Sequence, residues 1–255
     1  MSYEKHYDAN YLDRTAEGLK QIKLSSYTSL KGCNTIVDLG CGTGVDVFGM
    51  NSLFSESKII GVDHDPNLIA LAKETAVNNE AEDVEFFVGD AENLDMFKNQ
   101  TVDGVRLERV YQHLKKPDKV TDEIRRILTE GGRISALETD WCGINVFTPN
   151  IGLQRKLADY LTHEKVYNGI ASRSIYDLFL EKGFRNVRQK VVSFVIDNYS
   201  MANSVIKIDQ MIDEMSSAKI IKDSQADQFK ATLQQRQNSD SFAIGISMIQ
   251  ITAEK

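Results

Sequence analysis

The ten residues Thr35-Ile-Val-Asp-Leu-Gly-Cys-Gly-Thr-Gly44 decide the fold class of this chain. They are typical of a short apolar strand that ends at Asp38 and then turns through glycines at alternate positions, Gly40, Gly42 and Gly44. Glycine lets a backbone pass close to a bound ligand, where any Cβ would collide with it. The dinucleotide fingerprint G-x-G-x-x-G would need a glycine at the place of Val45. The stretch therefore predicts a strand and a ligand-binding loop of a different form, D-x-G-x-G-x-G.

A second strand is predicted over Lys58–Asp63 and ends in an acid. In doubly wound folds an acid about 20 residues beyond the glycine loop accepts the two ribose hydroxyls of a nucleotide, and Asp63 stands at that place. It could instead only cap the next helix, but Asp65 serves that purpose better. We expect Asp65 at the N-cap and Pro66 at the first helical position.

The third and fourth strands are predicted over Val84–Val88 and Val102–Leu107, and each is followed by an acid. Asp90 comes after the third strand and Glu108 after the fourth. Ligands bind at the carboxyl ends of the strands in open α/β sheets. We therefore expect these acids to meet at one edge of a sheet, beside the glycine loop.

The glycine loop and the acids after it resemble the motifs of the class I S-adenosylmethionine-dependent methyltransferases. Segments 106–113, 131–133 and 138–141 are similar to enzymes that methylate quinones and secondary metabolites. One departure is Glu130, where relatives usually have proline, and it concerns a turn. The resemblance implies S-adenosyl-L-methionine as the cofactor and a small organic molecule as the methyl acceptor.

The resemblance also implies roles for single residues. The glycine loop would approach the amino-acid end of the cofactor, Asp38 would hold its ammonium group directly or through water, and Asp90 would hydrogen-bond the adenine amino group. The structural alternatives are a tight turn for the glycines, an Asx-turn for Asp90 and a surface ion pair between Glu108 and Arg109. The residues expected to bind the cofactor are Arg14, Asp38, Gly40, Gly42, Gly44, Asp63, Asp90, Ala91 and Glu108.

The alternation of strands and helices predicts an α/β fold, Rossmann-like and doubly wound, with a mostly parallel seven-stranded sheet. A helix is expected over 118–129, capped by Asp118 and ended by Gly131-Gly132. A second late helix is expected over 174–182. The later strands are expected over 133–138, 187–196 and 242–252.

Three segments are expected outside the minimal βα core. Residues 1–30 predict an N-terminal helical lid segment, and residues 31–255 predict the methyltransferase domain with cap insertions at about 142–172 and 199–238. A helical stripe in the second insertion either packs in the cap or forms an adaptable wall for an acceptor. The stripe consists of Met201, Val205, Ile208, Met211, Ile212 and Met215.

Four polar or aromatic residues are candidates for a role in chemistry. A neutral imidazole can take a proton from an acidic acceptor near neutral pH, so His113 is the candidate catalytic residue, with a structural role as the alternative and His163 as a second candidate. Arg106 lies within a strand pattern and either faces the site or is paired, because a buried lone charge is costly. Trp141 either stacks on an acceptor ring or seals the edge of the core.

Composition excludes several classes of protein. The chain has 255 residues and a net charge of −7, which argues against a nucleic-acid partner. No apolar run approaches the roughly 18 residues of a membrane span, and the N-terminus lacks a signal-peptide profile, so we expect a cytoplasmic protein without a membrane partner. Three scattered cysteines and histidines without ligand spacing predict no metal site. We expect a monomer or a homodimer.

Two hypotheses of function remain beside a weaker third. The leading one is methyl transfer from S-adenosyl-L-methionine to a small acceptor by in-line displacement, at an undetermined O, N or C atom. The alternative is a cofactor-binding but non-catalytic regulatory or partner protein, whose cofactor motifs would be identical. A nicotinamide-dependent reductase is disfavoured by Val45 and Asp90.

Overall fold

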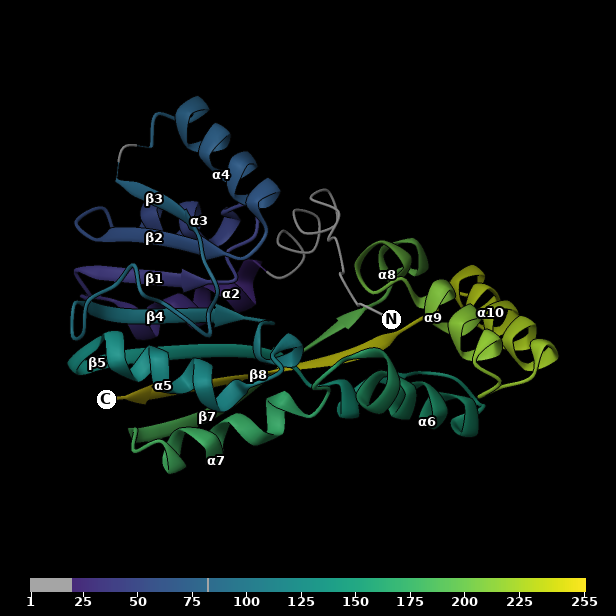
Figure 1. Ribbon diagram of the computed structural model, residues 1–255. Coiled ribbons are helices and arrows are strands. Elements are labelled where there is room, and N and C mark those ends of the chain that lie inside the picture. The colour runs from purple at the N-terminus through teal and green to yellow at the C-terminus, as the bar shows by residue number, and fades with distance from the viewer. Residues whose placement is uncertain (1–19, 82) are drawn as a thin grey trace.

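The computed structural model describes residues 20–81 and 83–255 (Figure 1). Arg14 and most of the N-terminal segment expected to form a lid lie outside the described residues. Within these residues, one sheet of eight strands has the order β3-β2-β1-β4-β5-β8, and β6 and β7 also pair with β8. The strands are β1 (Thr35–Leu39), β2 (Lys58–Asp63), β3 (Val84–Val88), β4 (Val102–Glu108), β5 (Leu128–Thr139), β6 (Asn145–Val146), β7 (Arg185–Ile196) and β8 (Ile244–Glu254).

The first five strands of the sheet run parallel, and β8 runs antiparallel to β5 and to β7. This arrangement confirms the predicted Rossmann-like, mostly parallel sheet. The seven predicted strands are present. β5 begins at Leu128, well before the predicted start at 133, and the other strands differ only slightly at their ends. The eighth, β6, has two residues and pairs with the start of β8 beyond the end of β5.

Helices cover both faces of the sheet and form a separate group beyond one end of it (Figure 1). The described α-helices are α2 (Lys20–Tyr27), α3 (Val45–Leu53), α4 (Pro66–Asn78), α5 (Pro117–Ile127), α6 (Ile151–Tyr160), α7 (Ala171–Glu181), α8 (Tyr199–Val205), α9 (Ile208–Ser217) and α10 (Asp223–Asn238). Asp65 caps α4 by accepting the backbone N–H of Asn67, with Pro66 in the first turn, as predicted. No helix over the described residues is long and apolar enough to cross a membrane.

Successive residues of the central strands point into two different cores. Ile36 packs in a core with Met50 of α3 and residues of α2 and α4. Its neighbour Val37 packs on the other face with Ile124 of α5 and Phe179 of α7. Parallel strands that are covered on both faces are apolar along their whole length. This explains the apolar residues Ile36, Val37 and Leu39 of β1, which are all buried.

The helix expected over 118–129 is shorter and begins earlier than predicted. It starts at Pro117, which suits the first helical turn. Lys116 occupies the N-cap and no side-chain cap is formed, so the prediction that Asp118 caps the helix is wrong. Asp118 lies in the first turn, where a carboxylate still interacts favourably with the helix dipole.

The end of this helix also differs from the prediction. Leu128 passes directly into β5, because it pairs with Val102 of β4. The glycines at 131 and 132 therefore lie inside β5 and do not end the helix. This strand pairing is a long-range contact that a local pattern of glycines does not reveal.

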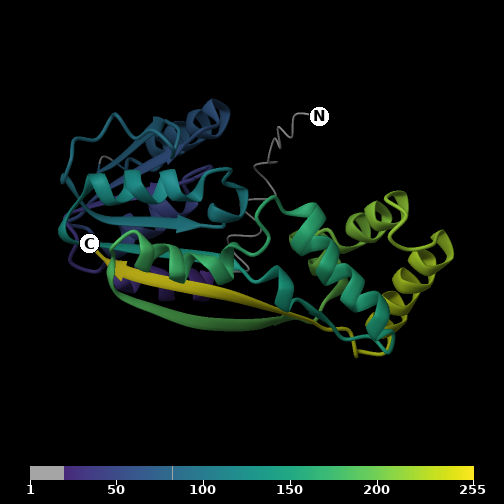
Figure 2. The same cartoon turned by 60° about the horizontal axis from the view of Figure 1, so that its bottom comes forward.

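The segments at 142–172 and 199–238, predicted as insertions, contain α6 and α8 to α10, which pack with β6 and the adjoining ends of β7 and β8 in a third core. In Figures 1 and 2 these four helices lie on the side toward which the parallel strands run. The predicted helical stripe is mostly packing: five of its six residues are buried in this core and only Met201 is exposed. We call α6, α8, α9 and α10 the cap.

Candidate active site

The glycine loop leaves β1 with all three glycines in the left-handed region. Their φ angles are +72° at Gly40, +56° at Gly42 and +83° at Gly44. This conformation is costly for residues with a Cβ, so it accounts for glycine at each position. The loop is tied to β2, because the N–H of Gly40 donates to the carbonyl of Val62 at 2.7 Å and the N–H of Gly42 donates to Asp63 Oδ2 at 2.9 Å.

Packing inside the protein is a second reason for two of these glycines. A Cβ on Gly40 would lie 2.6 Å from the side chain of Val110. A Cβ on Gly44 would lie 2.7 Å from the ring of Phe86. At these two positions the absence of a side chain serves close packing of the loop against β3 and against the segment after β4.

Asp63 joins the end of β2 to the glycine loop. Its side chain is 7% exposed, and its Oδ1 accepts the N–H of Asp65 at 2.9 Å and lies 3.1 Å from Nδ1 of His64. Hydrogen bonds from His64, Asp65 and Gly42 hold the pKa of Asp63 below its usual value in spite of its burial. Asp63 is therefore a carboxylate that already organises the loop, and its role as a ribose acceptor stays a prediction.

Asp90 and Ala91 follow β3 as the sequence predicted. Asp90 is exposed, and its Oδ1 accepts the N–H of Glu92 at 2.8 Å. This is the Asx-turn that was the structural alternative for Asp90. Ala91 packs at the edge of the core that contains α5 and α7. The turn leaves adenine recognition by Asp90 as a prediction.

Asp38 is fully buried and paired with Arg106 of the neighbouring strand β4. Asp38 Oδ1 lies 2.9 Å from Nη1 of Arg106, and Oδ2 has no hydrogen-bond partner among the described residues. Burial raises the pKa of Asp38 to about 7, although the Arg106 guanidinium lowers it. Of the two alternatives for Arg106, the structure selects pairing, and the partner is a predicted cofactor residue.

Arg106 is the centre of an ion cluster that extends to α2 and α3. Its other carboxylate partners are Glu108, at 2.5 Å, and Asp46 of α3, at 3.3 Å. Lys23 of α2 lies 2.8 Å from Asp46 and 3.3 Å from Glu108. Tyr27 donates to Asp46 and its ring lies beneath the guanidinium of Arg106. The described part of the N-terminal segment is thus bonded to the glycine-loop region by buried charges.

Glu108 and Arg109 form an ion pair, but not the surface pair that was the structural alternative for them. Arg109 Nη2 lies 3.2 Å from Glu108 Oε1. The Glu108 side chain is only 4% exposed, so this is a buried pair and not a surface one. Glu108 belongs to the ion cluster around Arg106, which places it next to Asp38 at the same sheet edge.

Hydrogen bonds order the side chains of Gln112, His113 and Trp141. The indole Nε1 of Trp141 donates to Oε1 of Gln112 at 2.7 Å, and Nε2 of Gln112 lies 2.9 Å from Nε2 of His113. An indole nitrogen only donates, so the oxygen of Gln112 must face Trp141 and its NH₂ must face His113. The Nε2 atom of His113 therefore accepts, and in the neutral ring the proton is on Nδ1.

Two residues that matter for this arrangement were not singled out from the sequence, Glu138 and Gln112. Glu138 Oε1 accepts the N–H of Tyr111 at 2.7 Å, and the residue is completely buried in β5. Burial raises the pKa of Glu138 to about 8, while the N–H groups of Tyr111, Val110 and Gln112 lower it. Arg106 drew attention because it is a charged residue inside an apolar strand. The same sequence signal could have identified Glu138.

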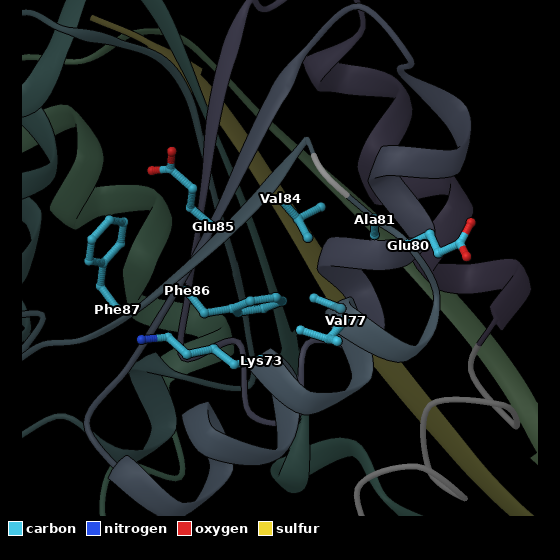
Figure 3. A pocket seen from close by; sticks show the side chains of 9 residues that line it. Lys73, Val77, Glu80, Ala81, Val84, Glu85, Phe86 and Phe87 are labelled. Atoms are coloured by element: carbon cyan, nitrogen blue, oxygen red, sulfur yellow. The ribbon is translucent and has the colours of Figure 1, made fainter.

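A cavity of about 660 Å³ lies at the outer edge of the sheet, between β3 and α4 (Figure 3). Residues that line it include Lys73, Val77, Val84, Glu85, Phe86 and Phe87. These residues belong to α4 and β3, and not to the loops that follow the carboxyl ends of the strands. The cavity is therefore separate from the site predicted at that edge.

A comparison with protein families matches residues 30–237 to the family described as "Methyltransferase domain". The chain is 28% identical over 217 residues to an uncharacterised 37.1 kDa protein of a Streptomyces fradiae transposon, covering 83% of the chain and 62% of that protein. It is 29% identical over 136 residues to an arsenite methyltransferase of Halobacterium salinarum, covering 53% of the chain and 34% of that protein.

Among solved structures, the fold is similar to phosphoethanolamine N-methyltransferase 2 of Haemonchus contortus, solved with phosphomonomethylethanolamine and S-adenosylhomocysteine. The TM-score is 0.61 at 16% identity, over 99% of this chain and 59% of that one. The chain thus spans less than two thirds of each of these three proteins. Because the family match covers most of the chain and the sheet is mostly parallel as predicted, this protein belongs to the methyltransferase-domain family, in the class I S-adenosylmethionine-dependent methyltransferases.

Proposed function

We propose that this chain transfers the methyl group of S-adenosyl-L-methionine to a small organic acceptor. The observation that carries the proposal is the bond between the glycine loop and Asp63, from the N–H of Gly42, at the carboxyl edge of a parallel sheet. Ligands of open α/β sheets bind at this edge. A strand-end acid and a left-handed glycine loop supply the carboxylate and the close backbone that a nucleoside ligand requires.

The residues at the site fit this cofactor. Asp38 Oδ2 is buried and lacks a hydrogen-bond partner within residues 20–81 and 83–255, so it can accept from an ammonium group. Asp63 would accept the ribose hydroxyls, and Asp90 with Ala91 would bind the adenine. Gly40, Gly42, Gly44 and Glu108 would surround the amino-acid end, and Arg14 is proposed to bind it from the N-terminal segment.

The cofactor supplies a methyl group that its sulfonium already activates. The protein's contribution is then to align the acceptor atom with the methyl carbon and the sulfur, and to exclude water. Alignment alone can supply roughly 7–11 kcal/mol of a reaction barrier. We assign the closing of the site to the cap, since its helices lie on the side toward which the strands run (Figure 1).

We propose that His113 takes the proton from those methyl acceptors that lose a proton in the reaction. Its Nε2 lone pair already accepts from Gln112. Proton transfer to His113 therefore requires Gln112 to release that atom. We propose this role only for acceptors that lose their proton late in the reaction, because the cofactor's methyl group is already activated.

A turnover assay tests the proposal against its alternatives. The protein is incubated with S-adenosyl-L-methionine and a panel of thiols, phenols, quinols and amines, and S-adenosylhomocysteine is quantified by mass spectrometry. We expect one acceptor class to give turnover that Asp63→Ala abolishes. Binding of S-adenosylhomocysteine without turnover on any acceptor would favour the non-catalytic regulatory protein. Binding of NAD in place of S-adenosylhomocysteine would favour the reductase.

A further inference from the structure

Glu138 occupies an unusual place for a carboxyl group. It is completely buried in β5, where most neighbouring side chains are apolar. Oε1 accepts the backbone N–H of Tyr111 at 2.7 Å. Oε2 has no hydrogen-bond partner in the part of the chain that the structure describes. A buried polar group without a partner is costly, so its presence in the strand calls for a compensating role.

The segment that Glu138 holds lies against the glycine loop. It begins at Arg109, which has a φ of +54° and donates its N–H to the carbonyl of Leu137 at 2.8 Å. The side chain of Val110 lies so close to Gly40 that a Cβ there would be 2.6 Å away. A left-handed conformation at a residue other than glycine persists only where its surroundings impose it. Here the bond from Arg109 to the carbonyl of Leu137 and the bond from Tyr111 to Glu138 tie this part of the segment to β5.

The same segment presents Gln112, which orients two other side chains. Its oxygen accepts from the indole of Trp141, and its NH₂ group donates to Nε2 of His113. Shifting the backbone at Tyr111 would move Gln112 and so break or lengthen both bonds. Glu138 is thus linked to Trp141 and His113 through the backbone N–H groups of this segment, that of Tyr111 at 2.7 Å, and through the amide side chain of Gln112.

Other anchors hold different atoms of the segment. The hydroxyl of Tyr111 bonds to Thr121 at 2.9 Å, in the core. Asn168 bonds to the carbonyls of Tyr111 and Gln112, at 3.2 and 2.9 Å. These anchors fix the Tyr111 side chain and the carbonyl side of the backbone. The backbone N–H of Tyr111 points toward Glu138. The bonds from Asn168 and the bond to Glu138 therefore hold the segment from its carbonyl groups and from its N–H group.

We propose that Glu138 is a positioning residue, which sets the orientation of Gln112 and through it the placement of Trp141 and His113 beside the glycine loop. The functional meaning of this role rests on the proposed function, since it concerns the side of the site assigned to the acceptor. The orientation itself can be measured without any cofactor or acceptor.

Trp141 makes that measurement direct, because it is the single tryptophan of the chain. The full-length ¹⁵N-labelled protein will show one indole N–H signal, whose shift and solvent exchange report on the bond to Gln112. The test variants are Glu138→Leu, which removes the acceptor, and Glu138→Gln, which keeps an acceptor oxygen. Gln112→Leu removes the acceptor of the indole N–H, so this variant gives the reference signal of an indole without that bond.

Asp103→Asn is the matched control. Asp103 lies in β4 and accepts the backbone N–H groups of Asn34 and Thr35, at 3.2 and 3.1 Å. It is thus a carboxylate that holds a loop at the opposite edge of the same sheet. Asp103→Asn replaces a carboxyl group by an amide, as Glu138→Gln does. Among the described residues, however, Asp103 makes no hydrogen bond to the segment that contains Gln112.

We expect Glu138→Leu to move the indole signal toward that of Gln112→Leu and to speed its exchange about fivefold, the effect of losing one modest hydrogen bond. Glu138→Gln should shift it less, and Asp103→Asn should leave it in place. An unchanged indole signal in folded Glu138→Leu would overturn the proposal. If Glu138→Leu does not fold, Glu138→Met, which also removes the acceptor, takes its place, and an unchanged indole signal in that variant overturns the proposal. Titration of the wild type with S-adenosylhomocysteine separately tests the proposed function.

Discussion

Two strand pairs at the carboxyl edge of the sheet use the same device. In the pair β1–β2, Asp63 accepts the N–H of Gly42 from the loop after β1, at 2.9 Å. In the pair β4–β5, Glu138 accepts the N–H of Tyr111 from the segment after β4, at 2.7 Å. In each pair an acid of the second strand holds the backbone that follows the first strand.

The two acids differ in what else surrounds them. Both oxygens of Asp63 have partners, and these donors hold its pKa below the usual value. Glu138 has one oxygen with no hydrogen-bond partner among the described residues, and burial raises its pKa to about 8. Asp63 is suited to bind hydroxyl donors as a carboxylate, and Glu138 to fix a segment. We call Asp63 with the loop after β1 the β1–β2 half, and Glu138 with the segment after β4 the β4–β5 half. We propose that the first half binds the cofactor, together with Glu108 at the end of β4, and that the second half arranges the acceptor side.

The largest expected effect concerns Arg106, which links the two halves. Arg106→Met would leave Asp38, Asp46 and Glu108 buried without their shared guanidinium. Removing one partner of a buried ion pair costs about 3–5 kcal/mol. We expect a loss of this size in the free energy of unfolding, measured with denaturant. Lys58→Met, which removes a half-exposed pair with Glu85, should cost less than about 1 kcal/mol; equal losses for both variants would contradict a central role of the cluster.

The second prediction sharpens the account of the glycine loop by comparing two glycines with similar φ. Gly44 has a φ of +83° and Phe86 in the way of a Cβ, whereas Gly32 has a φ of +85° and open space around it. Gly32→Ala should cost about 1–2 kcal/mol for its conformation alone. Gly44→Ala adds overpacking and should cost about 2–5 kcal/mol. Thermal unfolding of both variants measures the difference, and equal losses would show that Phe86 can yield.

The third prediction tests the proton on Glu138. Its folded-state pKa is raised from 4.5 to about 8, so between these values the unfolded chain has lost a proton that the folded protein retains. Stability should therefore fall as pH rises through this window, by at most about 1.4 kcal/mol per pH unit. Glu138→Gln should flatten the slope of the free energy of unfolding between pH 5 and 8, a range set by that pKa shift.

His64 titrates near the same window, because the hydrogen bond to Asp63 raises its pKa, and its contribution is also lost as pH rises. The comparison is therefore made between His64→Gln and the double variant His64→Gln/Glu138→Gln. Identical slopes would show that Glu138 is ionised throughout, and the contrast between the two acids would be lost.

The β1–β2 half could be predicted from the sequence because its signals are local. The strand, the glycines, Asp63 and the Asp65–Pro66 cap lie within one short stretch, and each element follows from the residues beside it. The parallel sheet followed from the alternation of apolar strands and helices, and the helices of the two insertions followed from their composition.

The β4–β5 half could not be predicted in the same way. Arg106 meets Asp38, and Glu138 meets Tyr111, only because the sheet places β4 between β1 and β5. Such contacts depend on register and topology. The direct passage of α5 into β5 could not be predicted for the same reason, since the pairing of Leu128 with Val102 overrides the local glycine signal.

The most direct test of the division between the halves is a calorimetric titration of S-adenosylhomocysteine into the wild type, Asp63→Asn and Glu138→Gln. Hydrogen bonds to a charged group contribute about 1.5–3 kcal/mol, against about 0.5–1.5 kcal/mol for neutral ones. We predict that Asp63→Asn weakens binding by at least about tenfold and that Glu138→Gln leaves the dissociation constant within about twofold. Equal affinities for the wild type and Asp63→Asn, or a larger loss in Glu138→Gln, would contradict the account.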